Sequence, residues 1–507
     1  MNHWIIAPVV LPALLAPLLA FVMRHDIVLA RVASMTGAVL LAGIAIGLAM
    51  LEAGGGTQVY FLGDWPAPFG IVLVLDRLSA VMLLLTALLS LVVLWHAIAT
   101  GWDNRGRHFH ALFQFQLMGI NGAFLTGDAF NLFVFFEVLL IASYGLMIHS
   151  GGRARMRAGL QYVVMNLAGS TLFLFALGTL YATTGTLNIA DLAVTVREMS
   201  PDDVALVRVA AVLLLVVFAI KAALFPVQFW LPGTYANAPA PVAALFAIMT
   251  KVGAYSIIRI YTIVFGPDVT ATQGVVTDWV MPAAVITVIA GAFGVLGAKK
   301  LMPMLAFSVV GSMGTLMIAV AAFTPYAMST ALYYLLHSTF SAAALFLLAD
   351  LVVAQRGNDT LTAQPPVAQN GLLAALFFAA AIGMTGMPPL SGFLGKLMVM
   401  DGVRDQSWMA LAWAVILLGS LVTIVGFARA GSVIFWKSTA QTVSEDALPS
   451  KATPLQLVPT MLALGLLAAL SLFAGPVAGY LEETATQLFD ASEYINAVLT
   501  PTMEGLK

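Results

Sequence analysis

The sequence contains no cysteine among its 507 residues. That absence excludes disulfide bonds, thiolate zinc sites and cysteine-ligated iron–sulfur clusters. Charged residues are also scarce, because Asp, Glu, Lys and Arg make up 9% of the chain, whereas a soluble domain carries about 25%. No basic tract is present, so we expect no nucleic-acid partner. A soluble domain of any size is therefore excluded.

Long apolar runs fill most of the chain, since 61% of its residues are hydrophobic. A run of about 20 apolar residues crosses a lipid bilayer as a helix. The sequence therefore predicts an all-α polytopic membrane protein with about 14 transmembrane helices. The runs assigned to these helices are 4–23, 30–51, 74–98, 111–126, 129–149, 158–182, 204–225, 240–265, 279–297, 301–323, 326–353, 371–400, 408–435 and 455–478. No small-residue cleavage site follows the first run, so we expect no cleaved signal peptide.

Basic residues in the loops predict the orientation of the chain. Every second loop is rich in Lys and Arg, and the positive-inside rule makes that side cytoplasmic. Both termini then lie outside, together with loops 53–73 and 183–203, while residues 437–454 form a cytoplasmic loop. The tail, 481–507, lies on the outer surface, docks on a partner or frays. The residues that set this orientation are Arg24, Arg31, Arg105, Arg107, Arg153, Arg155, Arg157, Lys299, Lys300, Arg356, Lys437 and Lys451.

Five ionisable residues lie well inside predicted spans, and they are the candidate functional residues. A charge at bilayer depth costs about 2.5–3.5 kcal/mol on insertion scales, so it rarely persists without a partner, a cavity or a task. Desolvation favours the neutral form of a lysine, a neighbouring carboxylate favours the charged form, and histidine titrates near neutral pH. Such a set is a plausible proton relay, and the alternative is a set of static ion pairs that fix helix packing. The five residues are Glu137, Lys221, Lys251, His337 and Lys396.

Three other charged residues within or beside the spans have simpler interpretations. Arg259 and Arg429 lie near helix ends, where their long stems can reach the membrane surface. Asp128 is expected to cap a helix N-terminus. The alternative is that Asp128, which lies just before Glu137, feeds a proton pathway.

The remaining histidines carry no sign of a metal or haem. No Cys or carboxylate cluster accompanies His108 and His110, so we expect no metal site. His96 and His149 lie near helix ends, and their spacing does not support haem ligation. The sequence therefore predicts no cofactor.

Prolines beside two of the buried lysines indicate broken helices. Pro226 follows Lys221, and Pro388 and Pro389 precede Lys396. A proline breaks its helix and frees backbone groups that only protein or water can satisfy. The two segments belong to the seventh and twelfth spans, which are five positions apart, so they cross the membrane in opposite directions. Paired broken helices in inverted halves indicate a transport site near mid-membrane.

Four segments carry a resemblance to a known family. They are residues 128–140 (DAFNLFVFFEVLL), 221–232 (KAALFPVQFWLP) with 236–242 (ANAPAPV), 251–255 (KVGAY) and 383–396 (GMTGMPPLSGFLGK). Over about residues 70–435 the chain resembles the antiporter-like subunits shared by Mrp cation/proton antiporters and respiratory complex I. It is most similar to the D subunits of Mrp antiporters. Lys396 argues against the M-type complex I subunit, whereas the N-type subunit remains the nearest competitor.

The resemblance implies a fold of fourteen helices, with two inverted five-helix repeats and broken seventh and twelfth helices. The chain then divides into N-terminal helices (1–110), a first repeat (111–265), a second repeat (279–435) and a C-terminal part (436–507). Glu137 would pair with Lys221 in a first half-channel, and Lys251 would be the central relay. His337 would connect the halves, and Lys396 would serve a second half-channel that leads outward.

The resemblance also implies a function. The chain would be part of a secondary transporter, not an enzyme, in a bacterial inner (cell) membrane. It would exchange cytoplasmic Na⁺, or another monovalent cation, for external H⁺, driven by the proton-motive force. Its partners would be Mrp subunits of the A, B, C, E, F and G types. Two rivals remain: a proton-pumping subunit of a complex I-like oxidoreductase or membrane-bound hydrogenase, and a passive scaffold.

Overall fold

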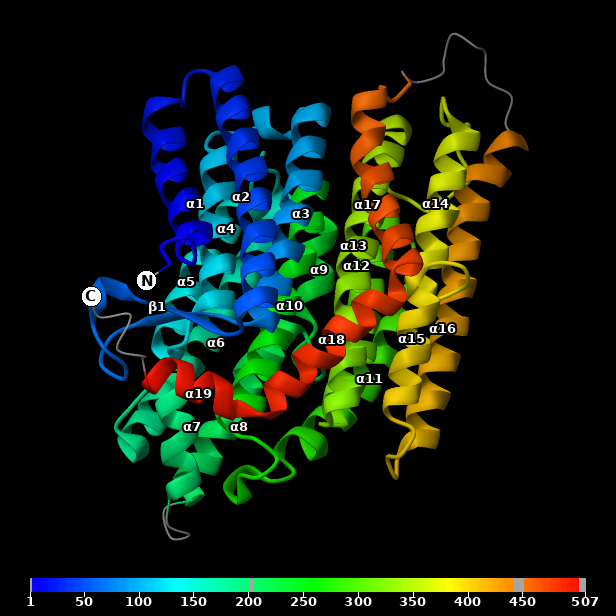
Figure 1. The fold of residues 1–507 in the computed structure, drawn as a ribbon. Coiled ribbons are helices and arrows are strands. Elements are labelled where there is room, and N and C mark those ends of the chain that lie inside the picture. The colour runs from blue at the N-terminus through cyan, green and yellow to red at the C-terminus, as the bar shows by residue number, and fades with distance from the viewer. Residues whose placement is uncertain (1, 200–203, 441–450, 501–507) are drawn as a thin grey trace.

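The computed structural model describes residues 2–199, 204–440 and 451–500, and within them the chain forms a bundle of helices (Figure 1). In these described ranges, eleven helices are long and apolar enough to cross a membrane, and shorter apolar helices accompany them. Each of the predicted apolar runs contains a helix, which confirms the all-α membrane fold. The bundle helices are α1 (Ala7–Pro17, continued to Val22), α2 (Ile27–Gly55), α3 (Arg77–Thr100), α4 (Phe109–Leu125), α5 (Ala129–Met147), α6 (Arg153–Thr184), α8 (Val204–Ala222), α10 (Ala240–Ile263), α11 (Val275–Gly297), α12 (Leu301–Ala321), α13 (Pro325–Arg356), α14 (Asn370–Thr385), α15 (Ser391–Gly402), α16 (Met409–Gly431) and α17 (Pro454–Leu472).

Two of the expected spans are broken, as the prolines predict. The seventh consists of α8 and the short α9 (Trp230–Asn237), separated by residues 223–229. The twelfth consists of α14 and α15, separated by residues 386–390. The breaks place irregular backbone inside the bundle, where neighbouring side chains must supply its hydrogen bonds.

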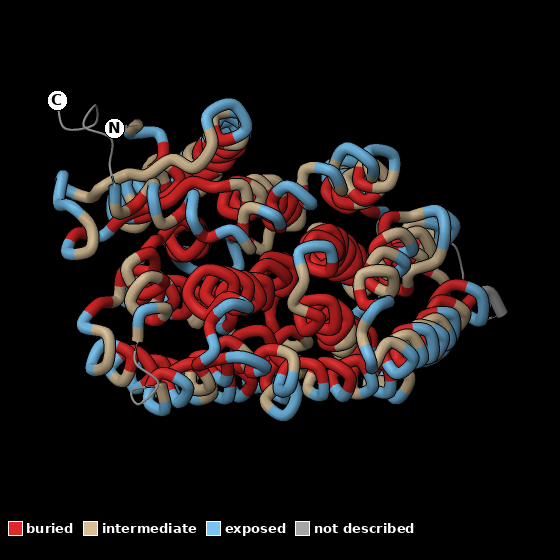
Figure 2. The backbone as a smooth tube through the Cα atoms, turned by 60° about the horizontal axis from the view of Figure 1, so that its bottom comes forward, coloured by how far each residue is buried: buried red, intermediate tan, exposed pale blue. Residues whose placement is uncertain are grey.

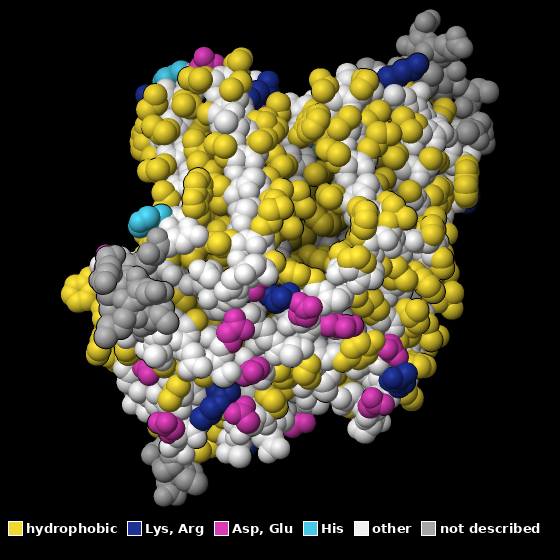
Figure 3. Space-filling view, viewed as in Figure 1, with side chains coloured by type: hydrophobic (Ala, Val, Ile, Leu, Met, Phe, Trp, Pro, Cys, Tyr) yellow, Lys and Arg dark blue, Asp and Glu magenta, His cyan; other side chains and the backbone are white. Residues whose placement is uncertain are grey.

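The centre of the bundle is formed by helices that are buried on all sides. Every residue of α10 is buried, and α12 and α13 are buried along most of their length. Figure 2 shows these central helices surrounded by others whose outward faces are exposed. In Figure 3 the upper half of this face is largely hydrophobic, with a few charged side chains at its top, and most of the visible Lys, Arg, Asp and Glu side chains are spread over the lower half. A hydrophobic surface this broad is expected of a protein that contacts lipid.

One end of the bundle carries a small β-hairpin that the sequence analysis assigned to a loop. Strands β1 (Gln58–Phe61) and β2 (Val72–Leu75) pair antiparallel, with Gln58 opposite Leu75. β2 consists of β-branched and aliphatic residues and is buried along its whole length, which favours a strand. The same end carries α7 (Ile189–Glu198), a short amphipathic helix in the expected loop 183–203.

The C-terminal tail is folded from residue 474 to 499, so the frayed alternative is wrong there. The fourteenth span ends at Leu472, and α18 (Ala474–Phe489) and α19 (Ala491–Leu499) turn along the end of the bundle (Figure 1). α18 packs on α13, and α19 packs on α7. The Glu493 carboxylate accepts a hydrogen bond of 2.9 Å from the Thr57 backbone N–H. The tail therefore docks on its own chain. Most of the predicted loop 437–454 lies outside the described residues.

Arg259 does not reach the membrane surface, and that interpretation is wrong. The residue is 2% exposed and forms a bidentate salt bridge with Asp76, the residue that caps α3. Arg259 Nε also donates to the Tyr255 hydroxyl at 3.1 Å. A buried carboxylate on a neighbouring element holds this arginine inside. The other two interpretations agree with the structure: Arg429 is exposed at the end of α16, and Asp128 accepts from Asn131 N at 2.7 Å as the cap of α5.

At the opposite end of the bundle, a buried carboxylate joins three elements. Asp103 follows α3 and accepts hydrogen bonds from Arg31 of α2, at 2.6 and 2.9 Å, and from His110 of α4, at 3.2 Å. Burial alone would raise the pKa of Asp103, but the hydrogen bonds from His110 and Arg31 and the charge of Arg31 lower it below its usual value. The carboxylate is therefore stabilised in its ionised form by the fold.

Asp103→Asn is expected to lower the apparent melting temperature of the purified protein at pH 7, because it leaves Arg31 without its ionic partner. A depressed pKa contributes stability that is present above the unfolded value, about 3.9, and is lost as the pH falls through the folded value. The gap between variant and parent should thus narrow as the pH falls below about 4. Thermal unfolding from pH 7 to pH 3 checks this, with the exposed Asp405→Asn as control. A gap that stays the same from pH 7 to pH 3 would contradict it.

Candidate functional site

Lys221 lies in the last turn of α8, directly before the break. Ala223 adopts a positive φ of 55°, and the chain leaves the helix there. Neighbouring side chains satisfy the freed backbone: Trp230 Nε1 donates to the Ile220 carbonyl at 2.9 Å, and Thr287 of α11 accepts from Phe225 N at 2.8 Å. The break is therefore built into the fold and holds Lys221 at the centre of the bundle.

The Lys221 ammonium is buried and bonded to a neutral acceptor. Its Nζ donates to Asn166 Oδ1 of α6 at 2.9 Å and lies 5.7 Å from the centre of the Phe136 ring. The side chain is nearly excluded from solvent, with 5% exposure. An amide oxygen is the one hydrogen-bond acceptor that it reaches among the described residues.

Glu137 lies on α5 beside the same stretch of α6. Its carboxylate accepts a hydrogen bond from the Ser170 hydroxyl. Within residues 2–199 and 204–440, Glu137 and Lys221 form no direct ion pair, although the charge of Glu137 acts on Lys221. The two charged groups are held one helical turn apart on α6, by Ser170 and Asn166 respectively. The direct pairing that the resemblance implies is not the arrangement in this structure.

Sequence reasoning missed Asn166 and Ser170. Both lie in the apolar run 158–182, four residues apart, so they share one face of α6. Polar residues at helical spacing on an otherwise apolar span were the available signal. A hydrogen-bonding residue inside a membrane helix is not costly enough to stand out as a lysine does.

Lys251 lies on α10, the helix that is buried from end to end. Its side chain has no exposed surface, and its Nζ has no hydrogen-bond partner among the described residues. Gly253 lets α10 approach the α8 break closely: a Cβ at this position would come within 2.5 Å of Ala222 N and 2.8 Å of Lys221 C. Lys251 is therefore a lysine without a partner among the described residues, on a helix that touches the backbone of Lys221.

His337 lies on α13, which packs against α10 on one side and α15 on the other. Its Nδ1 is 2.9 Å from the Ser391 hydroxyl at the start of α15, and its Nε2 has no partner in the part of the chain that the structure describes. Gly392 brings the second break against the imidazole, since a Cβ there would lie 2.9 Å from His337 Nε2.

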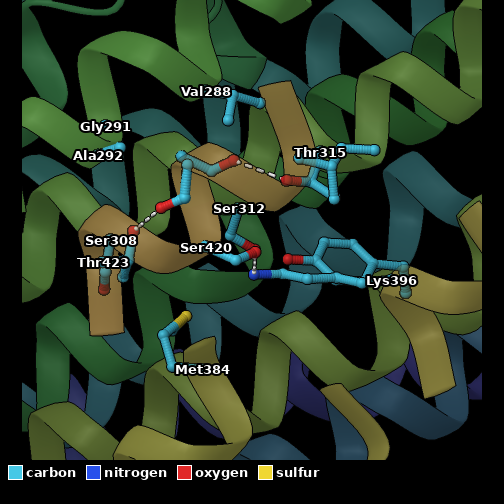
Figure 4. A pocket seen from close by; sticks show the side chains of 14 residues that line it. Val288, Gly291, Ala292, Ser308, Ser312, Thr315, Met384, Lys396, Ser420 and Thr423 are labelled. Carbon is cyan, nitrogen blue, oxygen red and sulfur yellow. Dashed lines mark hydrogen bonds between the residues drawn. The ribbon is translucent and has the colours of Figure 1, made fainter. Parts of the chain in front are cut away.

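Lys396 lies on α15 and points back toward the second break. Its Nζ donates to the Thr385 carbonyl at 2.8 Å and to the Ser420 hydroxyl of α16 at 2.7 Å. Figure 4 shows this ammonium in a cavity between α11, α12 and α16, lined by hydroxyl groups. The cavity has a volume of about 20 Å³, which is enough for a water molecule. The hydroxyl groups belong to Ser308, Ser312, Thr315, Tyr334, Ser420 and Thr423.

The five predicted residues thus lie on helices that form a connected series, in which each helix packs against the next. α5 packs on α6, α6 on α8, α8 on α10, α10 on α13, and α13 on α15. The helices therefore carry Glu137, Lys221, Lys251, His337 and Lys396 in that order across the bundle. In the described ranges, no three His, Asp or Glu side chains gather as metal ligands. The arrangement is suited to moving charge by protonation, one group to the next.

A helical bundle that contains two broken helices and a row of buried and half-buried titratable side chains has the architecture of an ion-transporting membrane subunit. Residues 126–423 match the protein family described as "NADH:quinone oxidoreductase/Mrp antiporter, TM". The chain is 38% identical to the D subunit of a probable K(+)/H(+) antiporter of Rhizobium meliloti (strain 1021), over 100% of this chain and 99% of that protein. It is 36% identical to the D subunit of the Na(+)/H(+) antiporter of Bacillus subtilis (strain 168), over 98% of this chain and 100% of that one. The chain therefore belongs to the family of Mrp antiporter D subunits.

Solved structures agree with this assignment. The chain superposes on a chain of the Mrp complex from Dietzia sp. DQ12-45-1b with a TM-score of 0.88 and 29% identity, covering 98% of this chain and 100% of that one. A chain of respiratory complex I from Thermus thermophilus matches with a TM-score of 0.79 and 24% identity, covering 98% and 99%. The second likeness shows the shared fold alone. The chain is part of an antiporter and is a multi-pass protein of the cell membrane.

Proposed function

We propose that this D subunit moves protons through the membrane plane along Glu137, Lys221, Lys251, His337 and Lys396. The observation that carries this proposal is Lys251, a lysine without exposed surface or hydrogen-bond partner in the described chain. Burying an unpaired ammonium costs free energy, so its presence in the fold indicates a function for a group that can lose its proton. A static ion pair, the structural alternative, requires a partner that Lys251 does not have among the described residues.

The direction of exchange follows from the family and from the charge distribution. The antiporter exchanges a cytoplasmic monovalent cation, Na⁺ or K⁺ as in the names of its relatives, for external H⁺. The proton-motive force drives the exchange. The loops rich in Lys and Arg face the cytoplasm and both termini lie outside, since the positive-inside rule applies to short loops. Residues 111–265 and 279–435 act as two inverted repeats, each with one broken helix.

The protein works within a larger complex. It assembles with Mrp subunits of the A, B, C, E, F and G types, because the similar chain from Dietzia is part of an Mrp complex. The rival function, proton pumping within a redox enzyme, rests on fold likeness at 24% identity. Purification of the native complex separates them: co-purified small membrane subunits support the antiporter, and co-purified quinone- or hydrogen-oxidising subunits contradict it.

The relay is tested by cation-dependent proton flux in vesicles that contain the complete complex. Glu137→Ala and Lys221→Ala are each expected to reduce the flux by about 10²-fold, the usual scale for losing one proton-transfer group. Arg429→Ala is the control, because Arg429 is a charged residue of a membrane helix but is exposed and donates to a backbone carbonyl, that of Ala298. Near-normal flux in both test variants would overturn the assignment of these residues.

A further inference from the structure

We propose that Asn166 is a positioning residue that holds Lys221 away from Glu137, so that the Lys221 ammonium alternates between the Asn166 amide and the Glu137 carboxylate. The inference rests on the relay proposed above and adds a residue to it. In this structure Lys221 Nζ donates a hydrogen bond to Asn166 Oδ1 at 2.9 Å, and the Glu137 carboxylate accepts one from the Ser170 hydroxyl instead. The arrangement is one of the two positions, with the ion pair open.

The orientation of the Asn166 amide makes it an acceptor for Lys221. Its Nδ2 donates to the Tyr162 carbonyl at 2.8 Å, which directs Oδ1 toward the ammonium. The side chain is 2% exposed, so water does not compete for this oxygen. Asn166 has no other hydrogen bond through Oδ1 within the described residues. The amide is therefore fixed by its own helix and presents one oxygen to Lys221.

The chemistry of the two acceptors differs in the way that a relay requires. An amide oxygen accepts a hydrogen bond from a charged ammonium and from a neutral amine alike. A carboxylate strongly favours the charged form, because an opposite charge within a few ångströms stabilises it. Lys221 at Asn166 can therefore give up its proton, whereas Lys221 at Glu137 keeps it. Alternation between the two acceptors converts a side-chain movement into proton release or retention.

The two residues of α6 that hold the charged groups, Asn166 for Lys221 and Ser170 for Glu137, are close together. Asn166 and Ser170 are four residues apart on α6, which places them about 6 Å apart along the helix. Lysine has a flexible four-carbon stem that covers this distance by rotamer changes. Gly169 lies on the same face between them, and a Cβ there would lie 4.0 Å from Lys221 Cε. A methyl group at this position would make only an ordinary contact with the lysine stem, whereas a larger side chain would extend into the space beside it.

The experiment measures cation-dependent proton flux against pH in vesicles that contain the complete complex. Asn166→Leu removes the acceptor at similar volume. It is expected to lower the maximal flux by about tenfold, because a hydrogen bond to a charged group contributes about that much. Asn166→Asp replaces the amide with a second carboxylate. Lys221 then keeps its proton at both positions, so the flux optimum should shift upward by about one pH unit or more. Asn166→Gln, which retains an amide, is expected to recover part of the flux.

Three further variants separate this inference from a merely structural role. Gly169→Leu fills the space beside the Lys221 stem and is expected to lower the flux about tenfold with Asn166 intact, while Gly169→Ala is tolerated. The matched control is Asn121→Leu, because Asn121 is an equally buried asparagine whose amide donates to the Pro8 carbonyl instead of serving a lysine. The amount of assembled complex is measured for each variant.

The outcomes are distinct. An unchanged pH profile in Asn166→Asp together with normal flux in Asn166→Leu would overturn this inference, and so would equal losses in Asn166→Leu and Asn121→Leu. If Lys221→Ala still abolishes flux in that case, the proposed relay stands without Asn166. If the Asn166 variants do not assemble, Gly169→Leu decides: normal flux in assembled complex overturns the inference, and loss supports it.

Discussion

Lys251→Met is expected to reduce cation-dependent proton flux to the level of vesicles without the complex, a loss of more than about 10³-fold. Lys251 lies on the one bundle helix buried at every described residue, between the helices that carry Lys221 and His337. Its Nζ has no hydrogen-bond partner among the described residues, so no neighbouring side chain is in place to take over the role of the ammonium. Its loss interrupts the row at the centre, whereas a loss at either end leaves the remaining groups connected.

The same substitution should raise stability, which distinguishes function from structure. Methionine has nearly the same shape as the lysine stem and removes a charge that costs about 2.5–3.5 kcal/mol at bilayer depth. We therefore expect a higher apparent melting temperature for Lys251→Met together with lost flux. Lys251→Arg keeps a charge but cannot release a proton, so it should be inactive as well. Flux in the arginine variant would contradict a proton-exchanging role, and a large destabilisation in Lys251→Met would favour a structural one.

The spans and the titratable row could be predicted from the sequence because both rest on strong local signals. Each predicted apolar run contains a helix, since a lipid-crossing segment must be apolar over its whole length. A lysine such as Lys221 or Lys251 stands out within such a run without any knowledge of its neighbours. The breaks were predictable for the same reason, because the prolines beside Lys221 and Lys396 remove backbone donors.

The partners of these residues could not be predicted, because partners depend on how helices pack. Lys221 bonds Asn166, which is 55 positions away in the sequence, and Glu137 bonds Ser170 rather than Lys221. The interpretation of Arg259 was also wrong, because a position near a helix end indicates a side chain that reaches water. Asp76 lies beside Arg259 because α3 packs against α10, and the sequence does not reveal that packing. A docked tail was expected only on a partner, and its docking on its own chain could not be predicted, because the contacts of α18 with α13 and of α19 with α7 depend on how the helices pack.

The Asp76–Arg259 pair yields the largest expected effect on stability. Both residues are buried, at 3% and 2% exposure, and the bidentate contact joins the start of α3 to α10. Removing one partner of a buried pair leaves an uncompensated charge and costs about 3–5 kcal/mol. Arg259→Gln and Asp76→Asn are each expected to lower the apparent melting temperature strongly and to reduce the amount of assembled complex. The asparagine keeps an oxygen that can cap α3, so the loss reports the charge pair and not the cap.

The double variant, Asp76→Asn with Arg259→Gln, should recover a large part of this loss, because two neutral amides leave no buried charge. A double-mutant cycle on the purified protein then gives a coupling energy of several kcal/mol. The control is the ion pair of Arg197 and Asp268, whose carboxylate side chain is 58% exposed. Its singly substituted variants should change stability by about 0–1 kcal/mol. A double variant as unstable as the sum of its two single changes would show that Arg259 and Asp76 act separately. Recovery would instead place the pair as the contact that holds α10, and with it Lys251, against the N-terminal helices.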